Sequence, residues 1–203
     1  MKATMSGLPS ALPSRTEMLR ALGTPPGRSR TGDDPVVVTM IESPLGPLLA
    51  AARDAGVRLL EYGDRRQLGP QLQAMAHRFG RAVVPGEHPL LDRLRDELAG
   101  YFRGRRQVFS LPLLTDGTPF QEKVWEALRG LAYGETISYG ELARRVGRPT
   151  ASRAVAQANH QNRLSILIPC HRVVGKDGSL TGYGGGLWRK RLLLRLERTG
   201  TPL

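Results

Sequence analysis

The sequence contains one cysteine, Cys170, among 203 residues, and it has no long apolar run. A single cysteine excludes an internal disulfide and a cysteine-rich zinc site, so any role for it depends on one reactive thiol. No segment approaches the roughly 20 apolar residues that cross a bilayer, and the N-terminus lacks the apolar segment of a signal peptide. We therefore predict a cytoplasmic protein with no membrane partner.

Acidic residues are scarce relative to basic ones. The chain has 30 Lys and Arg against 18 Asp and Glu, a net charge of +12, and its hydrophobic content of 40% is enough to build a core. The C-terminal half has the larger excess, with 14 basic against 7 acidic residues over 115–203 and 11 against 8 over 36–114. Such a surface attracts polyanions, most commonly nucleic acid, although a solvated basic surface without a ligand stays open.

The N-terminal half has the pattern of a small α/β domain, predicted to span 36–114. Residues 1–35 are rich in Pro, Gly, Ser and Thr and are predicted to be a loosely ordered lead. Apolar spacing predicts an antiparallel sheet of three strands, Val36–Ile41, Leu48–Ala52 and Val57–Tyr62. It also predicts two helices and one further strand, namely Leu68–Phe79, Pro89–Phe102 and Val108–Leu111.

The C-terminal half, 115–203, is predicted to be mostly helical. Thr118 and Gln121 form a capping box at the start of a core helix, with a proline at the first helical position. Ser138 and Glu141 form a second capping box that starts a short helix. These signals predict where two helices begin.

The second of these helices and the one after it have the pattern of a helix-turn-helix. Gly147-Arg148-Pro149 forces a turn, and Thr150 is predicted to cap a helix that ends near His160. The pattern is of moderate specificity, because many helical hairpins bind nothing. The second helix of this pair has a polar face and several small side chains, which suit contact with either DNA or solvent. The polar residues are Arg153, Gln157 and His160, and the small ones are Ser152, Ala154 and Ala156.

Cys170 follows an apolar run that predicts a buried strand. The run is Leu164–Ile168, and Pro169 ends it, so the cysteine is expected at the strand's end. A lone cysteine is most often a small buried hydrophobe. Attack on carbon requires the thiolate, which needs a base or a positive environment, and His171 and Arg172 immediately follow the cysteine. Since successive residues of an extended chain point to opposite sides, the coupling is expected through a water or after a backbone turn.

The last predicted helix carries an acidic residue beside its apolar stripe. It runs from about Leu187 to Arg198, with Gly200 as a stop signal, and Glu197 lies one turn after Leu193. This carboxylate can reach inward and orient a histidine in a triad with a cysteine, or it can form a surface ion pair with a nearby arginine. Both interpretations stay open on the residues alone.

Several segments in order resemble the O6-alkylguanine-DNA alkyltransferases, over residues 36–199. The most specific is Ile168-Pro169-Cys170-His171-Arg172-Val173, and the others are Thr118–Gln121, Ile137–Tyr139, Arg153–Val155, Asn162, Gly182-Tyr183 and Glu197. The resemblance implies an α/β (α+β) fold. Its N-terminal domain would be ribonuclease H-like, and its mostly helical C-terminal domain would hold a winged-helix-like helix-turn-helix and the active site.

The resemblance also implies the chemistry. Cys170 would accept the alkyl group, His171 would take its proton through a water, Glu197 would polarise that histidine, and Asn162 would support the turn. The partner would be double-stranded DNA that contains O6-alkylguanine, with O4-alkylthymine as an open second substrate. Each molecule would act once, without cofactor or metal, and we expect a monomer.

Residues that contact the DNA and the flipped base are implied in the same way. Tyr139 would crowd the target phosphate, and Arg153 would fill the vacated stack, because chemistry on a base requires that it leave the duplex. The neighbouring contacts and the base pocket would come from Ser152, Ala154, Tyr183, Gly184 and Gly185. Three positions, Arg163, Ser165 and Gly184, depart from the family's pattern and bear on the width of the pocket.

Two other functions compete with this one. A cysteine hydrolase would also use Cys, His and an acid, but it needs an oxyanion hole that a basic helix-turn-helix does not supply. A DNA-binding regulator or damage sensor without catalysis is the stronger rival. Pure binding, however, has no use for the Cys170 thiol.

Overall fold

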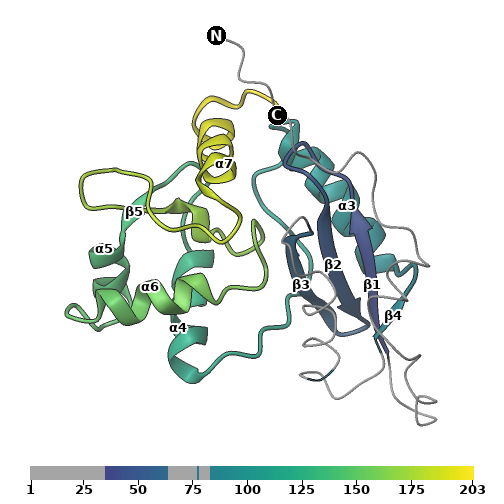
Figure 1. Cartoon of the computed structure of the whole chain (residues 1–203), viewed down its shortest axis with the longest axis horizontal. Coiled ribbons are helices and arrows are strands. Elements are labelled where there is room, and N and C mark those ends of the chain that lie inside the picture. Colours follow the sequence, from purple (N-terminus) through teal and green to yellow (C-terminus); the bar gives the residue numbers. More distant parts are fainter. Residues whose placement is uncertain (1–34, 64–76, 78–82) are drawn as a thin grey trace.

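The computed structural model describes residues 35–63, 77 and 83–203. The predicted lead and the predicted helix at 68–79 lie outside these residues, apart from Pro35 and His77. Figure 1 shows a sheet with one helix on one side of the molecule and a group of helices on the other. The described chain is therefore α+β, and none of its helices is long and apolar enough to cross a membrane.

A four-stranded sheet forms the N-terminal half, in the order β3-β2-β1-β4. The three predicted strands are confirmed as β1 (Val36–Ile41), β2 (Leu48–Arg53) and β3 (Gly56–Tyr62), paired antiparallel. The sequence pattern missed β4 (Val83–Pro85), which pairs parallel to β1. Its three residues are too few for an alternating pattern to show.

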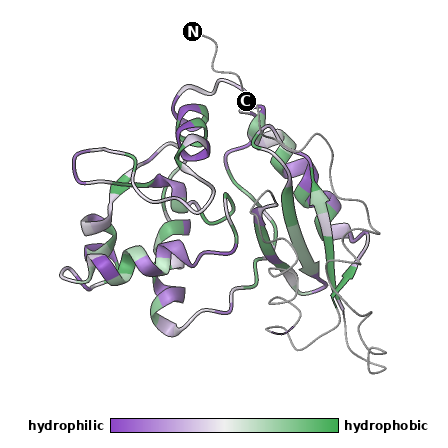
Figure 2. Cartoon of the chain, viewed as in Figure 1, coloured by the Kyte–Doolittle hydropathy of each residue, from purple (hydrophilic) through white to green (hydrophobic). Residues whose placement is uncertain are grey.

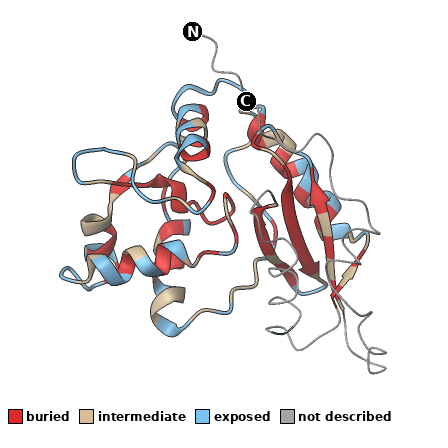
Figure 3. Cartoon of the chain, in the orientation of Figure 1, coloured by how far each residue is buried: buried red, intermediate tan, exposed pale blue. Residues whose placement is uncertain are grey.

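Helix α3 (Pro89–Phe102) covers the sheet and confirms its predicted bounds. The His88 side chain accepts a hydrogen bond from the amide of Leu90, and Pro89 occupies the first turn, where its missing N–H costs nothing. The apolar face of α3 packs on β2 and β3 with Leu91, Leu94, Leu98, Tyr101 and Phe102. Figures 2 and 3 show the apolar strands of the sheet buried beside this helix.

The predicted strand Val108–Leu111 is wrong, because this segment forms no strand. The carboxylate of Glu97 accepts hydrogen bonds from the amide of Ser110 at 2.9 Å and from its hydroxyl at 2.6 Å. A side chain of α3 thus takes a backbone donor that a strand would need. Two residues after this segment, Leu113 pairs with the sheet as an isolated bridge to Val57.

Three helices pack together in the C-terminal half: α4 (Pro119–Arg129), α5 (Tyr139–Arg145) and α6 (Ser152–His160). The capping box of Thr118 and Gln121 is confirmed. At α5, Ser138 accepts from the amide of Glu141, which is the first half of the predicted box. Thr150 is not a cap, because α6 begins at Ser152 and no side chain caps it.

Two short strands and a final helix complete this half. β5 (Ile137–Ser138) pairs parallel with β6 (Val173–Val174). The last helix, α7 (Leu187–Thr199), confirms the prediction and ends at Gly200, which takes the left-handed conformation (φ 67°) that favours glycine.

Candidate active site

A tight turn, rather than a strand, leads into Cys170. The predicted strand Leu164–Ile168 is wrong. Its four apolar residues are buried, but the segment forms only isolated bridges, and Ile166 has a positive φ of 72°. Asn162 shapes the turn, because its side-chain oxygen accepts from the amide of Leu164 and its nitrogen donates to the carbonyl of Ile168, both at 2.9 Å. The turn delivers Cys170 to the start of a single 3₁₀ turn, η1 (Cys170–Arg172).

His171 and Glu197 form a buried pair. Nε2 of His171 lies 2.8 Å from Oε1 of Glu197, and the imidazole is completely buried. A carboxylate only accepts, so Nε2 carries the proton and Nδ1 presents a lone pair. Within the described part of the chain Nδ1 has no hydrogen-bond partner. Burial lowers the pKa of His171, against the opposing effect of Glu197, so the ring is neutral and basic at Nδ1.

The carboxylate of Glu197 is held from several directions. Arg172 donates through Nε to Oε2 at 2.8 Å and through Nη2 to Oε1 at 3.0 Å, the Tyr101 hydroxyl donates at 2.7 Å, and the Gly134 amide donates at 3.1 Å. Burial would raise its pKa, but the hydrogen bond and charge of His171, followed by those of Arg172, lower it. Glu197 therefore orients the histidine and also pairs with an arginine, but in the interior rather than at the surface.

A buried lysine lies close to the thiol. Nζ of Lys190 is fully buried and donates to the carbonyls of Val173 at 2.5 Å and Thr181 at 2.7 Å. Burial lowers its pKa to about 8, while Cys170 acts in the opposite direction. Burial also raises the pKa of the Cys170 thiol, and the Asn162 side chain and the positive charge of Lys190 lower it part of the way back. The thiol thus needs a base, and Lys190 stabilises its anion.

The residues expected to meet DNA lie on α5 and α6. Arg153 and Ala154 are exposed on α6, as are Gln157 and His160, while Ser152 is partly buried. Tyr139 begins α5, and its pKa is raised by burial and, to a smaller degree, by the nearby charge of Cys170. The exposed residues of α6 thus lie on the helix that packs against α5, and Tyr139 at the start of α5 lies near Cys170.

A glycine-rich loop before α7 carries the last of the predicted site residues. Tyr183 is partly buried, and burial, the neighbouring Tyr62 and then Cys170 raise its pKa. Gly184 is exposed and Gly185 is buried. Cys170, His171, Glu197 and Asn162 are thus in one contact network, with Tyr139 and Tyr183 near the thiol, whereas the α6 residues form a separate surface.

The sequence interpretation missed Tyr101 and Lys190 as members of this site. Arg172, which the sequence offered as positive charge near the thiol, donates to Glu197. No sequence signal connects Tyr101 with Glu197, since the two residues are far apart in the chain. For Lys190 the sequence did contain a signal. This residue precedes Leu193 and Leu196 at helical spacing, so it lies on the buried stripe of α7. A cation at an apolar position indicates a paired or functional group.

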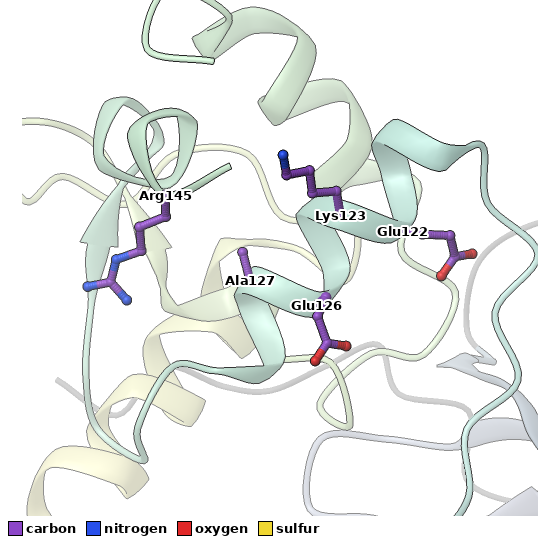
Figure 4. Close-up of a pocket in the computed structure, with 5 residues that line it drawn as sticks. All are labelled: Glu122, Lys123, Glu126, Ala127 and Arg145. Carbon is purple, nitrogen blue, oxygen red and sulfur yellow. The ribbon is translucent and has the colours of Figure 1, made fainter. Parts of the chain in front are cut away.

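A separate hollow of about 540 Å³ opens on α4 (Figure 4). It is lined by Glu122, Lys123, Glu126, Ala127 and Arg145. Glu122 already accepts from Thr115 and Gly117, and Arg145 already pairs with Glu135, so these charges serve the fold. Among the described residues, no group of three His, Cys, Asp or Glu is placed to hold a metal ion.

The fold and the site together fit one class of protein, in which a helix-turn-helix accompanies a buried cysteine that is followed by a glutamate-bound histidine. Residues 119–199 match the family model of the 6-O-methylguanine DNA methyltransferase DNA-binding domain. The methylated-DNA–protein-cysteine methyltransferase of Salmonella typhimurium is 44% identical over 160 residues, which cover 77% of this chain and 92% of that protein. The constitutive one of Bacillus subtilis is 43% identical, with 79% and 94% covered.

Solved structures agree with the sequence comparisons. The crystal structure of Mycobacterium tuberculosis OGT in complex with DNA has a TM-score of 0.72 and 40% identity, covering 82% of this chain and 96% of that one. The O6-methylguanine-DNA methyltransferase of Pyrococcus kodakaraensis has a TM-score of 0.60 and 25% identity, with 80% and 98% covered. The chain belongs to the family of methylated-DNA–protein-cysteine methyltransferases.

Proposed function

We propose that the protein repairs O6-alkylguanine in double-stranded DNA by moving the alkyl group onto Sγ of Cys170. The observation that carries this proposal is the state of His171: Nε2 is bound to Glu197, while Nδ1 keeps a lone pair inside a buried site beside the cysteine. That arrangement makes a base for one proton from the thiol.

The reaction follows from these groups. The thiol proton passes through a bridging water to Nδ1 of His171, and Glu197 stabilises the imidazolium that forms. Sγ attacks the alkyl carbon, so a carbon–sulfur bond forms as the carbon–oxygen bond breaks. The electron pair goes to O6 of guanine, whose ring takes up a proton. Because the resulting thioether is stable toward every group in the relay, each molecule acts once.

The exposed face of α6 supports base flipping as the mode of access. An alkyl carbon stacked in a duplex cannot reach a thiol that is 6% exposed, so the base must leave the helix. In our proposal Arg153 fills the vacated stack, Ser152 and Ala154 lie against the groove, and Tyr139 displaces the target phosphate. Tyr183, Gly184 and Gly185 line the pocket that receives the base.

The same proposal covers the finer architecture. We assign 36–114 to a ribonuclease H-like domain and 115–203 to a winged-helix-like domain, supported by the sheet order β3-β2-β1-β4 and by the β5–β6 pair beside α5, which packs on α6. We also infer that the protein acts on double-stranded DNA that contains O6-alkylguanine, in the cytoplasm and as a monomer.

Intact-mass spectrometry tests the function. Wild type and Cys170→Ser are incubated with a duplex that contains one O6-methylguanine. We expect wild type to gain one methyl group, located on Cys170, and to stop at one equivalent, while the variant gains none. Wild-type protein that binds the damaged duplex but stays unmodified would identify a damage sensor instead.

Salt-dependent binding tests the DNA surface. Arg153→Ala should weaken binding to the damaged duplex and reduce the slope of log K against log salt by about 1 if the guanidinium contacts a phosphate, or lower it less if Arg153 inserts into the stack. Arg129→Ala is the matched control, since Arg129 is exposed on α4 and pairs with Glu126. Equal losses in the two variants would show that α6 is not the recognition surface.

A further inference from the structure

The glycine-rich loop that precedes α7 is clamped by the N-terminal sheet. Tyr62, the last residue of β3, is 1% exposed, and its hydroxyl lies 2.9 Å from the hydroxyl of Tyr183 in the loop. The two rings meet edge to face, with centroids 6.0 Å apart and an interplanar angle of 70°. A residue of the sheet therefore fixes both the position and the orientation of a loop tyrosine.

Arg189 holds the other end of the loop. Its guanidinium lies 4.3 Å from the centre of the Tyr62 ring and 4.4 Å from that of Trp188. It donates to the carbonyl of Leu45 at 2.7 Å and to that of Gly185 at 2.8 Å. One buried cation thus joins the turn between β1 and β2 to the backbone of the loop, and it stacks on the same tyrosine that binds Tyr183.

Gly185 allows the loop to lie against the sheet. A Cβ atom at this position would overlap the Tyr62 ring and would come within 2.9 Å of the Tyr183 ring. The start of the loop is held beside the cysteine segment, because Lys190 bridges the carbonyls of Thr181 and Val173. The loop is therefore fixed at both ends, with the sheet on one side and the thiol's surroundings on the other.

We propose that Tyr62 and Arg189 are positioning residues that set the width of the alkyl pocket, and so the size of the alkyl group that Cys170 accepts. This inference rests on the proposed function, in which Tyr183, Gly184 and Gly185 line that pocket. A loop anchored by a hydroxyl pair, a stacked guanidinium and a close glycine contact cannot change its position without disturbing all three. A rigid wall discriminates between substrates by size, and a released wall discriminates less.

The Tyr62→Phe variant tests the proposal while keeping the ring and its stacking on Arg189. Rates of transfer to Cys170 are measured by intact mass with duplexes that carry O6-methylguanine or O6-benzylguanine. We expect the benzyl-to-methyl rate ratio to rise about three- to tenfold, the range given by losing one hydrogen bond, while the methyl rate stays within about twofold. Val36→Ala is the control, because it opens a cavity in the same sheet away from the loop.

A complementary pair tests the close contact. Gly185→Ala should lower transfer of both alkyl groups, because its Cβ pushes the loop off the Tyr62 ring. Adding Tyr62→Leu makes room for that methyl, so the double variant should recover most of the methyl rate and show a raised benzyl-to-methyl ratio. A double variant no faster than Gly185→Ala alone would contradict the contact's role.

The outcomes separate this inference from the proposed function. If wild type takes up no methyl group, the proposed function fails. If wild type reacts but the ratio in Tyr62→Phe equals that of wild type, or moves equally in Val36→Ala, the transfer chemistry stands and the clamp does not set alkyl size.

Discussion

Each half of the molecule has a buried carboxylate on a helix whose pKa is lowered by its partners, Glu97 on α3 and Glu197 on α7, and the two have different roles. Glu97 on α3 is 3% exposed and Glu197 on α7 is 6% exposed. Glu97 accepts from the amide and hydroxyl of Ser110 and from Arg93. Glu197 accepts from His171, Arg172, Tyr101 and Gly134. In both, burial would raise the pKa, but the partners lower it.

The difference lies in what each carboxylate holds. Glu97 holds the loop at Ser110, so its hydrogen bonds stabilise the fold and have no further role. Glu197 fixes a histidine beside a cysteine, so the same kind of contact also sets a tautomer and leaves Nδ1 basic. A buried ion pair is therefore evidence for function only when it controls a second titratable group near a reactive atom.

Neutralising the two carboxylates should give the largest contrast. Glu197→Gln leaves Arg172 buried without its anion, so we expect a loss of about 3–5 kcal/mol in the free energy of unfolding, together with a loss of alkyl transfer. Glu97→Gln should cost less, about 1.5–3 kcal/mol, because its arginine partner is half exposed, and transfer should persist. Denaturant unfolding and intact mass measure the two effects.

The contrast between the two carboxylates would be wrong if alkyl transfer depended only on the stability of the protein. In that case Glu97→Gln, with destabilisation matched by adding denaturant, would lose transfer as Glu197→Gln does. Retained transfer in the first variant and loss in the second would assign the catalytic effect to the Glu197–His171 contact.

Acid should lower the free energy of unfolding in two steps, the first from His171 in the C-terminal half and the second from the buried glutamates of both halves. The folded state lowers the pKa of His171 below 6.5, so stability present above that pH starts to fall as the pH drops below it. Both glutamates have lowered pKa values, so their contribution is present above 4.5 and is lost as the pH falls through their folded values. In His171→Gln the first step should vanish while the second remains, as followed by unfolding at a series of pH values.

Removing one donor from Glu197 tests how far its surroundings matter. Tyr101→Phe deletes a 2.7 Å hydrogen bond to a charged group, so we expect a loss of about 1.5–3 kcal/mol in stability and a smaller fall in transfer than in Glu197→Gln. Tyr133→Phe is the control, since its hydroxyl is 3.5 Å from the carbonyl of Leu196 and should contribute little. Equal losses of stability and transfer in the two variants would show that the hydrogen bond from Tyr101 to Glu197 has no special role.

Lys190 gives the smallest expected effect, and it acts on the thiol rather than on the histidine. Lys190→Met removes a positive charge that lowers the pKa of Cys170, so the variant has less thiolate at pH 7 and its reaction with a small disulfide reagent should be several-fold slower. Above about pH 8 Lys190 loses its proton, and the two rates should converge. A difference in rate between wild type and Lys190→Met that stays constant with pH would indicate altered packing around the thiol instead.

Local patterns predicted much of the fold and the site. The strands β1, β2 and β3, the helix α3, the capping box at Thr118 and the end of α7 at Gly200 depend on neighbouring residues, and all were confirmed. The contact between His171 and Glu197 agrees with the triad that the residues allowed. The bridging water and the DNA contacts stay predictions.

Other predictions failed where a side chain outside the predicted segment decided the course of the backbone. Glu97 takes the donors of Ser110, so no strand forms there, and Asn162 bends the apolar run before Cys170 into a turn. An apolar run shows that a segment is buried, but it does not show which group takes its hydrogen bonds.

The sequence by itself determined the residue types and the local starts and stops: one thiol, a histidine beside it, a carboxylate on a helical stripe and a basic C-terminal half. Only the tertiary structure decided which nitrogen of His171 is free to act, that Tyr101 and Arg172 share Glu197, and that Tyr62 clamps the pocket loop. The physical reason is that pKa values, tautomers and loop positions depend on burial and on partners far apart in the chain, which no local pattern records.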